Sequence, residues 1–411
     1  MKPIVTIVAA VLALGLVFAL SPNGPAGIDV PVTASADDIH ALVDANNAFA
    51  FDMYSTVASR EGNLFLSPYS ISSALAMTYA GASGGTASEM AATLRFALVP
   101  EQVHAAFSQL NQVFNAGGKG YRLSVANALW AQKGFDFKPD FLTTAKRYYG
   151  AGARIVDFAG NTEGARKTIN RWVENNTENK IIELIKEGVL DQLTRLVLTN
   201  AIYFKGRWEH EFRPESTTNA PFYLAAGAQP ADVPFMRQTE RFRYAENDEA
   251  QVLELPYAGG ELAMLVVLPK RHSSIGELEA SLKASGLEPI IDMLATRRVA
   301  VSLPRFKFAA ELSLKSSLQQ LGMVDAFDDM RADFSAMCEE HVYITAVLHK
   351  AFVEVNEEGT EAAAATGVVV GVRSVMVDEP VTFTADRPFL FAICDLRTDS
   401  ILFMGRLADP R

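Results

Sequence analysis

The chain has 411 residues, and 49% of them are hydrophobic, which is ample for a large core. Its formal net charge of −11 argues against nucleic-acid binding, which needs a basic surface. Only two cysteines occur, Cys338 and Cys394, so disulfides do not form the framework of the fold. They could pair, but the polar surroundings of Cys338 and the apolar strand pattern around Cys394 favour separate thiols. No zinc-type Cys/His spacing occurs, and we expect no metal and no cofactor.

Residues 1–36 have the pattern of an export signal followed by a disordered spacer. Met1-Lys2 supplies a positive start, Ile4 to Leu20 is apolar and uncharged, and Ala34-Ser35-Ala36 fits a small-x-small cleavage site. We therefore expect a secreted or extracytoplasmic protein. Because this site lies far beyond Leu20, the alternatives are an earlier cut or an uncleaved membrane anchor.

The first elements predicted after residue 36 are helices. Asp37 to Ser59 has apolar residues at helical spacing after a capping aspartate. A second helix is expected over Ile71 to Ala80, where Ser67 and Ser70 stand near its start as candidate caps.

A glycine-rich stretch, residues 81–86, follows the second helix. It lacks the Gly-Lys-Ser/Thr ending of a phosphate-binding loop, and no clear strand precedes it, so we interpret it as a break between two helices. The next predicted helix, Ser88 to Phe96, carries Arg95 as its only cation.

Strands dominate the rest of the chain. Leu123 to Gln132 is one, and Leu196 to Trp208 is the strongest. It is apolar on both faces over most of its length, with Asn200 as a polar exception, as expected of a central strand. Three further strands, Val252 to Tyr257, Ala263 to Leu268 and Val299 to Leu303, end at or near prolines, and their close spacing predicts antiparallel pairing.

The C-terminal part begins with a predicted helix, Leu312 to Leu321, which ends at Gly322. Tyr343 to Asn356 is a strand candidate containing His349. No serine or cysteine nucleophile motif accompanies this histidine, so we interpret it as structural and the protein as no enzyme. Phe389 to Ile393 and Ile401 to Leu407 form a terminal hairpin.

The stretch from Glu357 to Ser374 fits neither helix nor strand well. Its alanines favour helix, its valines favour strand, and its glycines weaken both. Residues 360–370 alternate so that one face would carry only small or β-branched groups, while Glu361 lies on the other face. Such a segment is expected to be exposed, yet it could enter a sheet as a strand. A small-residue linker is the alternative.

Three motifs resemble the serpin family. Glu357-Glu358-Gly359-Thr360-Glu361-Ala362-Ala363-Ala364 is similar to the proximal hinge of a serpin reactive-centre loop. Phe383 to Phe391 resembles the segment that closes this loop, and Phe403-Met404-Gly405-Arg406 resembles the C-terminal strand. The resemblance spans residues 37–411. It implies one α+β domain with three mainly antiparallel β-sheets, eight or nine helices and an exposed reactive-centre loop over about 357–380.

The resemblance also implies site residues. The hinge would comprise Glu357, Gly359, Thr360, Glu361, Ala362, Ala363, Ala364 and Ala365. The shutter beneath the large sheet would comprise Ser67, Ser70, Asn200 and His349, and Trp208 would lie in the breach where the loop first enters. The family's usual hinge length puts the reactive bond at Arg373-Ser374, and Arg373 is the only cation between Gly359 and Asp386. Val372 and Met376 are the neighbouring candidates.

The implied function is suicide-substrate inhibition. A trypsin-like, Arg-specific protease would form a covalent acyl complex at Arg373, and the cut loop would insert into the large sheet. The alternative is a non-inhibitory serpin that acts as a carrier, binding protein or chaperone. We expect no nucleic-acid partner, no heparin-type activation, and a monomer in which loop–sheet polymerisation is possible.

Overall fold

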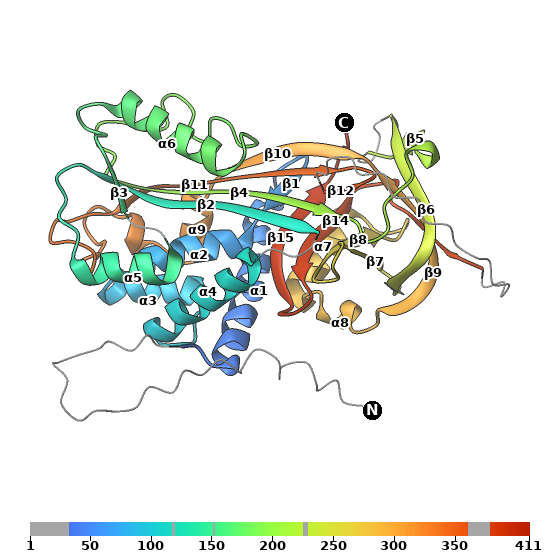
Figure 1. The fold of residues 1–411 in the computed structure, drawn as a ribbon, viewed down its shortest axis with the longest axis horizontal. Coiled ribbons are helices and arrows are strands. Elements are labelled where there is room, and N and C mark those ends of the chain that lie inside the picture. Colours follow the sequence, from blue (N-terminus) through green and yellow to red (C-terminus); the bar gives the residue numbers. More distant parts are fainter. Residues whose placement is uncertain (1–32, 117–119, 151–152, 225–228, 361–378) are drawn as a thin grey trace. The chain divides into compact units, whose positions relative to one another are not determined.

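Two hydrogen-bonded sheets organise the fold (Figure 1). The structure is a computed structural model, and it describes residues 33–116, 120–150, 153–224, 229–360 and 379–411. The strand order of the six-stranded sheet is β10-β11-β12-β4-β2-β3. The nine-stranded sheet has the order β1-β15-β14-β8-β7-β6-β9-β13, with β5 paired to β6.

The helices of the described residues are α1 (Ala36–Val57), α2 (Pro68–Tyr79), α3 (Gly84–Thr93), α4 (Pro100–Asn115), α5 (Pro139–Tyr149), α6 (Thr162–Asn176), α7 (Ile275–Ser285), α8 (Glu288–Ile291) and α9 (Lys315–Gln320). The strands are β1 (Leu64–Leu66), β2 (Tyr121–Gln132), β3 (Ala153–Val156), β4 (Leu196–Arg207), β5 (Thr218–Phe222), β6 (Ala231–Glu246), β7 (Ala250–Pro256), β8 (Leu262–Pro269), β9 (Ala295–Pro304), β10 (Phe306–Ser313), β11 (Ile344–Val355), β12 (Gly359–Thr360), β13 (Val381–Thr384), β14 (Phe389–Asp395) and β15 (Ser400–Leu407).

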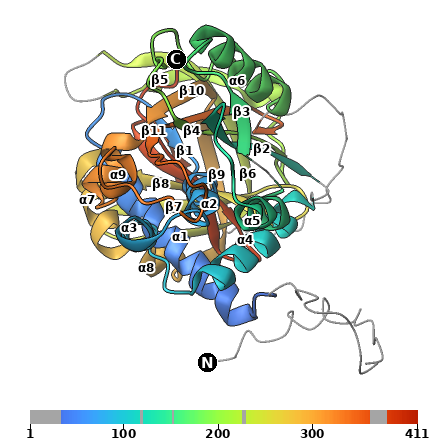
Figure 2. The same ribbon diagram turned by 90° about the vertical axis from the view of Figure 1, so that its left-hand side faces the viewer.

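The six-stranded sheet is covered by helices on both faces. In Figures 1 and 2, α6 lies on one side of β2, β4 and β11, and the helices α1 to α5 lie on the other. A strand covered in this way is buried on both faces, which is why β4 is apolar nearly throughout. Helix α2 is also covered on all sides, and each of its 12 residues is buried.

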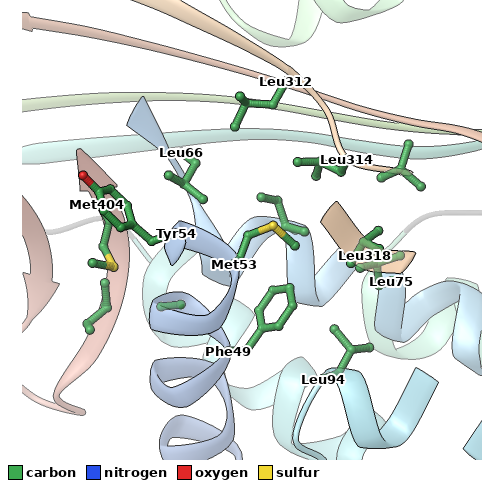
Figure 3. Close-up of a cluster of buried hydrophobic side chains, with 14 of the residues drawn as sticks. Phe49, Met53, Tyr54, Leu66, Leu75, Leu94, Leu312, Leu314, Leu318 and Met404 are labelled. Atoms are coloured by element: carbon green, nitrogen blue, oxygen red, sulfur yellow. The ribbon is translucent and has the colours of Figure 1, made fainter. Parts of the chain in front are cut away.

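A large apolar cluster fills the space between the helices and the sheets. Figure 3 shows Phe49 and Met53 of α1 facing Leu75 of α2, with Leu312 and Leu318 closing the cluster from β10 and α9. All five are buried, so each contributes on the order of 1.5–3 kcal/mol of transfer free energy. This cluster fixes α2 against the sheet, and the position of α2 matters for the site below.

Most elements agree with the sequence predictions. The predicted α+β class is confirmed, and antiparallel pairs prevail, with parallel pairing at β4–β11, β2–β3 and β9–β13. Strands β7, β8 and β9 each end at a predicted proline stop: Pro256, Pro269 and Pro304. The two cysteines are separate buried thiols, as expected.

Three expectations are corrected. The strands form two hydrogen-bonded sheets within the described residues, because the long β6 pairs with β9 and also, through its last residues, with β7. The segment 312–321 is only partly helical, because its first residues complete β10. Glu357, Gly359 and Thr360 are buried and not exposed, because the first loop residues have already entered the six-stranded sheet.

Candidate functional site: a partly open seam in the six-stranded sheet

The parallel pair of β4 and β11 forms a seam through the sheet. The two strands pair from Leu196 and Ile344 to Tyr203 and Phe352. Beyond that point they no longer pair with each other, and β12 lies between them. Thr360 is opposite Val355 of β11 on one side and Gly206 of β4 on the other. The seam is therefore closed along most of its length and already occupied at one end by the start of the loop.

Glycine is required at the entrance. A Cβ atom added to Gly359 would lie 2.0 Å from the carbonyl oxygen of Gly206 and 2.7 Å from Cα of Arg207. Both atoms belong to the backbone of β4, so neither can turn aside. The absence of a side chain at 359 lets β12 approach β4 closely enough to pair.

Thr360 is fixed in a buried aromatic pocket. Its side chain is fully buried, and its hydroxyl lies 2.6 Å from the hydroxyl of Tyr257. The Tyr257 ring stacks on Trp208 with centroids 4.7 Å apart, and the indole of Trp208 donates to the carbonyl of Asn356 at 3.0 Å. The predicted breach residue Trp208 thus lies against the first hinge residues.

Glu357 anchors the base of the loop. Its carboxylate accepts a hydrogen bond from the hydroxyl of Thr217 at 2.7 Å and is 3.4 Å from the guanidinium of Arg305. Its carbonyl accepts from the backbone N–H of Phe212 at 2.8 Å. The first two contacts compensate the buried charge, and all three hold the position from which β12 starts.

A buried polar network closes the seam farther along. His349 of β11 lies opposite Asn200 of β4, and its Nδ1 is hydrogen-bonded to the side-chain oxygen of Asn200. Its Nε2 accepts from the backbone N–H of Ser67 at 3.3 Å, so the proton must be on Nδ1. The hydroxyl of Ser67 donates to the carbonyl of Leu402 at 2.7 Å. The network therefore links β4, β11, the start of α2 and β15.

The side-chain amide of Asn200 continues the network toward β2. It donates to the hydroxyl of Ser70 at 2.6 Å and to the side-chain oxygen of Asn127 at 2.5 Å. Asn127 in turn donates to the carbonyl of Ser70 at 3.2 Å. The four residues predicted for the shutter are thus brought together. Asn127 is a fifth member that the sequence did not single out, and its signal was an amide between the apolar pairs Val125-Ala126 and Ala128-Leu129.

The hydrogen bonds of this network require His349 to be neutral. Burial lowers the pKa of His349 from its ordinary 6.5 to about 3. Protonation of Nε2 would remove the acceptor for the Ser67 N–H and leave a buried charge without a carboxylate partner in the network. The neutral form is therefore the one that keeps β4, β11 and α2 together.

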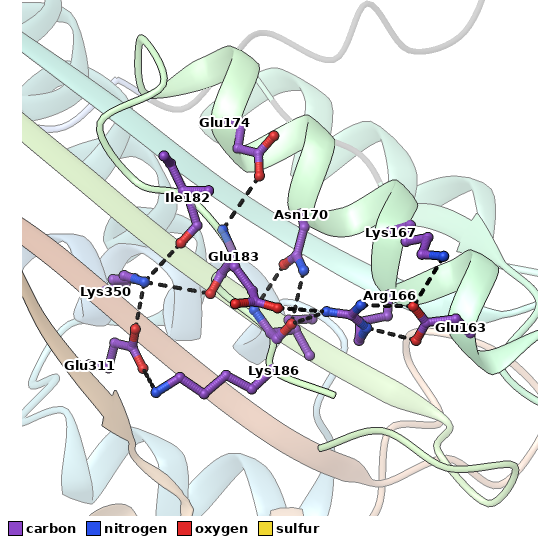
Figure 4. Close-up of polar contacts among 11 residues, drawn as sticks. Glu163, Arg166, Lys167, Asn170, Glu174, Ile182, Glu183, Lys186, Glu311 and Lys350 are labelled. Atoms are coloured by element: carbon purple, nitrogen blue, oxygen red, sulfur yellow. Dashed lines mark hydrogen bonds and ion pairs between the residues drawn. The ribbon is translucent and has the colours of Figure 1, made fainter. Parts of the chain in front are cut away.

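A second set of contacts covers the seam from the α6 side (Figure 4). Lys350 of β11 donates to the carbonyl of Ile182 at 2.8 Å and pairs with Glu311 at 2.5 Å. The side-chain amide of Asn170 in α6 donates to the backbone carbonyl of Ile185 and accepts from the backbone N–H of Ile185, each at 2.8 Å. The segment after α6 is thus tied both to the helix and to β11.

The remaining predicted site residues lie outside the described part of the chain: Glu361, Ala362, Ala363, Ala364, Ala365, Arg373 and Ser374. Within the described part, no helix is both long and apolar enough to cross a bilayer. Also within it, no three His, Cys, Asp or Glu side chains are grouped so that they could hold a metal ion.

Comparison with known proteins agrees with this geometry. A sequence model of the serpin (serine protease inhibitor) family matches residues 44–410. Human leukocyte elastase inhibitor is 43% identical over 90% of this chain and 99% of its own length. An uncharacterised serpin-like protein of Thermococcus kodakarensis is 41% identical, over 90% of this chain and 86% of its own.

Solved structures are similar as well. Uncleaved ovalbumin has a TM-score of 0.83 and 32% identity, covering 90% of this chain and all of the ovalbumin chain (100%). The thermophilic serpin tengpin in its native state has a TM-score of 0.83 and 28% identity, covering 92% of this chain and 96% of its own. The chain therefore belongs to the serpin family, a family of protease inhibitors and not of enzymes.

Proposed function

We propose that the protein inhibits an Arg-specific, trypsin-like protease as a suicide substrate. The observation that carries the proposal is β12, in which Gly359 and Thr360 pair with β4 and Thr360 also pairs with β11. The chain that follows would only have to extend this strand along the seam. Insertion would then carry an attached protease away from the entrance.

The residues that follow suit such an extension. Residues 361–370 contain no proline and only one charge, Glu361, and that charge falls on the face opposite Thr360. About ten new backbone hydrogen bonds at roughly 0.5–1.5 kcal/mol each would release on the order of 10 kcal/mol. A loop tethered at both ends cannot collect this energy, so the uncut state would be kinetically trapped.

The bait is Arg373. Attack by a protease serine on the Arg373 carbonyl would break the bond to Ser374, release the new amino terminus and leave Arg373 as an acyl ester. The arginine side chain suits an acidic primary pocket. The curated relatives reported above include an inhibitor of elastase, so Arg specificity rests on residue 373 and not on them.

Incubation with trypsin tests the proposal. We expect a complex that survives SDS and a new N-terminus beginning at Ser374. Cleaved chain without a stable complex would indicate a non-inhibitory serpin. A new N-terminus that begins elsewhere, for example after Val372 or Met376, would overturn the assignment of the reactive bond.

We further propose that the protein is exported. The support is the apolar run from Ile4 to Leu20, which follows a lysine and precedes a small-x-small site. Fractionation of the source cells with N-terminal sequencing of the mature chain tests this, and it separates release from anchoring. Retention of the intact chain in the cytoplasm would contradict it.

A further inference from the structure

An arginine pair lies on the outer surface of the nine-stranded sheet. Arg241 of β6 is directly opposite Arg298 of β9, and both side chains are exposed. Like charges in this arrangement destabilise a sheet. Neighbouring Arg243 is paired with Glu254 at 2.7 Å, whereas within the described residues Arg241 makes no ion pair. The pair is a local basic site in a chain whose net charge is −11.

A hydroxyl-lined groove continues from this pair along the same face. Its volume is about 670 Å³, and its lining includes Arg237, Thr239, Ser302, Thr382 and Thr384. By strand alternation these residues share the face of Arg241 and Arg298. We call the arginine pair and this lining the arginine face.

The arginine face lies beside the distal attachment of the reactive-centre loop. Val381, the first residue of β13, pairs with Val299, which is next to Arg298 in the chain. Seven residue steps separate Ser374 from Val381, so the proposed reactive bond can be at most about 25 Å from it. A protease of about 220 residues has a radius of gyration of roughly 17 Å. The surface of a protease bound at Arg373 can therefore reach this face.

We propose that the arginine face is a docking surface for an acidic patch of the target protease, located outside the protease active site. This rests on the proposed function, since it takes Arg373 as the attacked residue. The net charge of the inhibitor would repel an acidic protease at long range. A local basic surface next to the loop offsets this repulsion, speeds encounter and favours an orientation in which the loop reaches the active site. The hydroxyl groups of the groove can accept and donate further hydrogen bonds at the contact.

Two trypsins with the same primary specificity and opposite net charge provide the test. Catalytically inactive anionic and cationic trypsins are titrated with the wild-type inhibitor, with R241E/R298E and with the control R60E/K133E. The control makes the same change in charge at exposed positions outside β6, β9 and β13. We expect the double variant to bind the anionic trypsin about tenfold more weakly at low salt, and the control to bind it like the wild type. Binding to the cationic trypsin should not weaken in either variant.

The active trypsins separate this inference from the proposed function. If the inactive enzymes show the expected charge dependence but the active ones form no SDS-stable complex, the docking surface stands and trapping fails. If complexes form and the double variant binds anionic trypsin like the control, docking is overturned. A third outcome is that R241E/R298E binds anionic trypsin like the control but, unlike the control, is no longer retained on a dextran sulfate column. This outcome would overturn docking of a protease in favour of an anionic polysaccharide.

Discussion

His349 and Asn200 face each other across the parallel strands β11 and β4 and are hydrogen-bonded through their side chains. Both are almost completely buried. A strand that extends along the seam past this pair must break the contact. The same two side chains are tied to Ser67 and Ser70 at the start of α2, so the contact couples the seam to the helical layer beneath it.

Acidification should weaken the closed seam. The pKa of His349 is about 3 when folded and near 6.5 when unfolded, so the unfolded chain binds more protons between these values. The stabilisation is therefore complete above pH 6.5 and is lost as the pH falls, by up to about 1.4 kcal/mol per pH unit. Midpoints of urea-induced unfolding from pH 7.5 to 5 measure this.

His104 provides the control, because burial lowers its pKa to about 4 at a site between α4 and α5 that is outside the network. Both His349→Gln and His104→Phe should flatten the pH dependence of the urea midpoint. The His349→Gln variant should also polymerise more readily at neutral pH, whereas His104→Phe should not promote polymers. Equal polymerisation of both variants would contradict a specific role for His349.

Asn127→Ala should cost about 1–3 kcal/mol of the free energy of unfolding. It removes the acceptor for the Asn200 amide and for the Ser70 hydroxyl, and both groups remain buried. Urea unfolding at pH 7.5 measures the loss. Asn219→Ala removes an exposed amide contact of 3.3 Å to Asp232 and should change stability by less than about 0.5 kcal/mol. Equal effects of the two substitutions would remove Asn127 from the network.

Thr360→Glu should convert the inhibitor into a substrate. A carboxylate at this position would be buried beside Tyr257 without a cation, which opposes β12 and its extension. We expect trypsin to cleave the variant after Arg373 at an undiminished rate with little SDS-stable complex. Thr360→Ser keeps the hydroxyl and should trap normally. Normal trapping by the glutamate variant would contradict the insertion of this residue.

Gly359→Val should have a similar outcome for a steric reason, because its Cβ would overlap the carbonyl of Gly206. The yield of SDS-stable complex per cleaved inhibitor should fall severalfold. Gly276→Ala is the matched control, since an added Cβ there meets nothing within 4 Å, and the yield should be unchanged. A valine variant with wild-type yield would show that β12 can form without close approach to β4.

Local sequence was sufficient to predict an element where one physical preference dominated. The apolar run of β4 predicted a central strand because both of its faces are covered, and Pro256, Pro269 and Pro304 predicted strand ends because proline cannot donate to a ladder. The helix predicted from Leu312 onward is wrong for Leu312 and Ser313, which belong to β10. Their pairing with His349 and Leu348 of β11 overrides local propensity, and no local pattern reports a distant partner.

Three features could be read from the order of residues alone: the alternation of small residues after Gly359, the lone cation Arg373 between Gly359 and Asp386, and the motifs of the serpin family. The fold was needed to show that Gly359 and Thr360 are already buried, that Asn127 completes the polar network, and that Lys350 ties the segment after α6 to β11. The reason is that these features depend on residues brought together from separate elements. Asn127 and Asn200 are 73 positions apart in the chain, and their hydrogen bond exists only because β2 and β4 pair in one register.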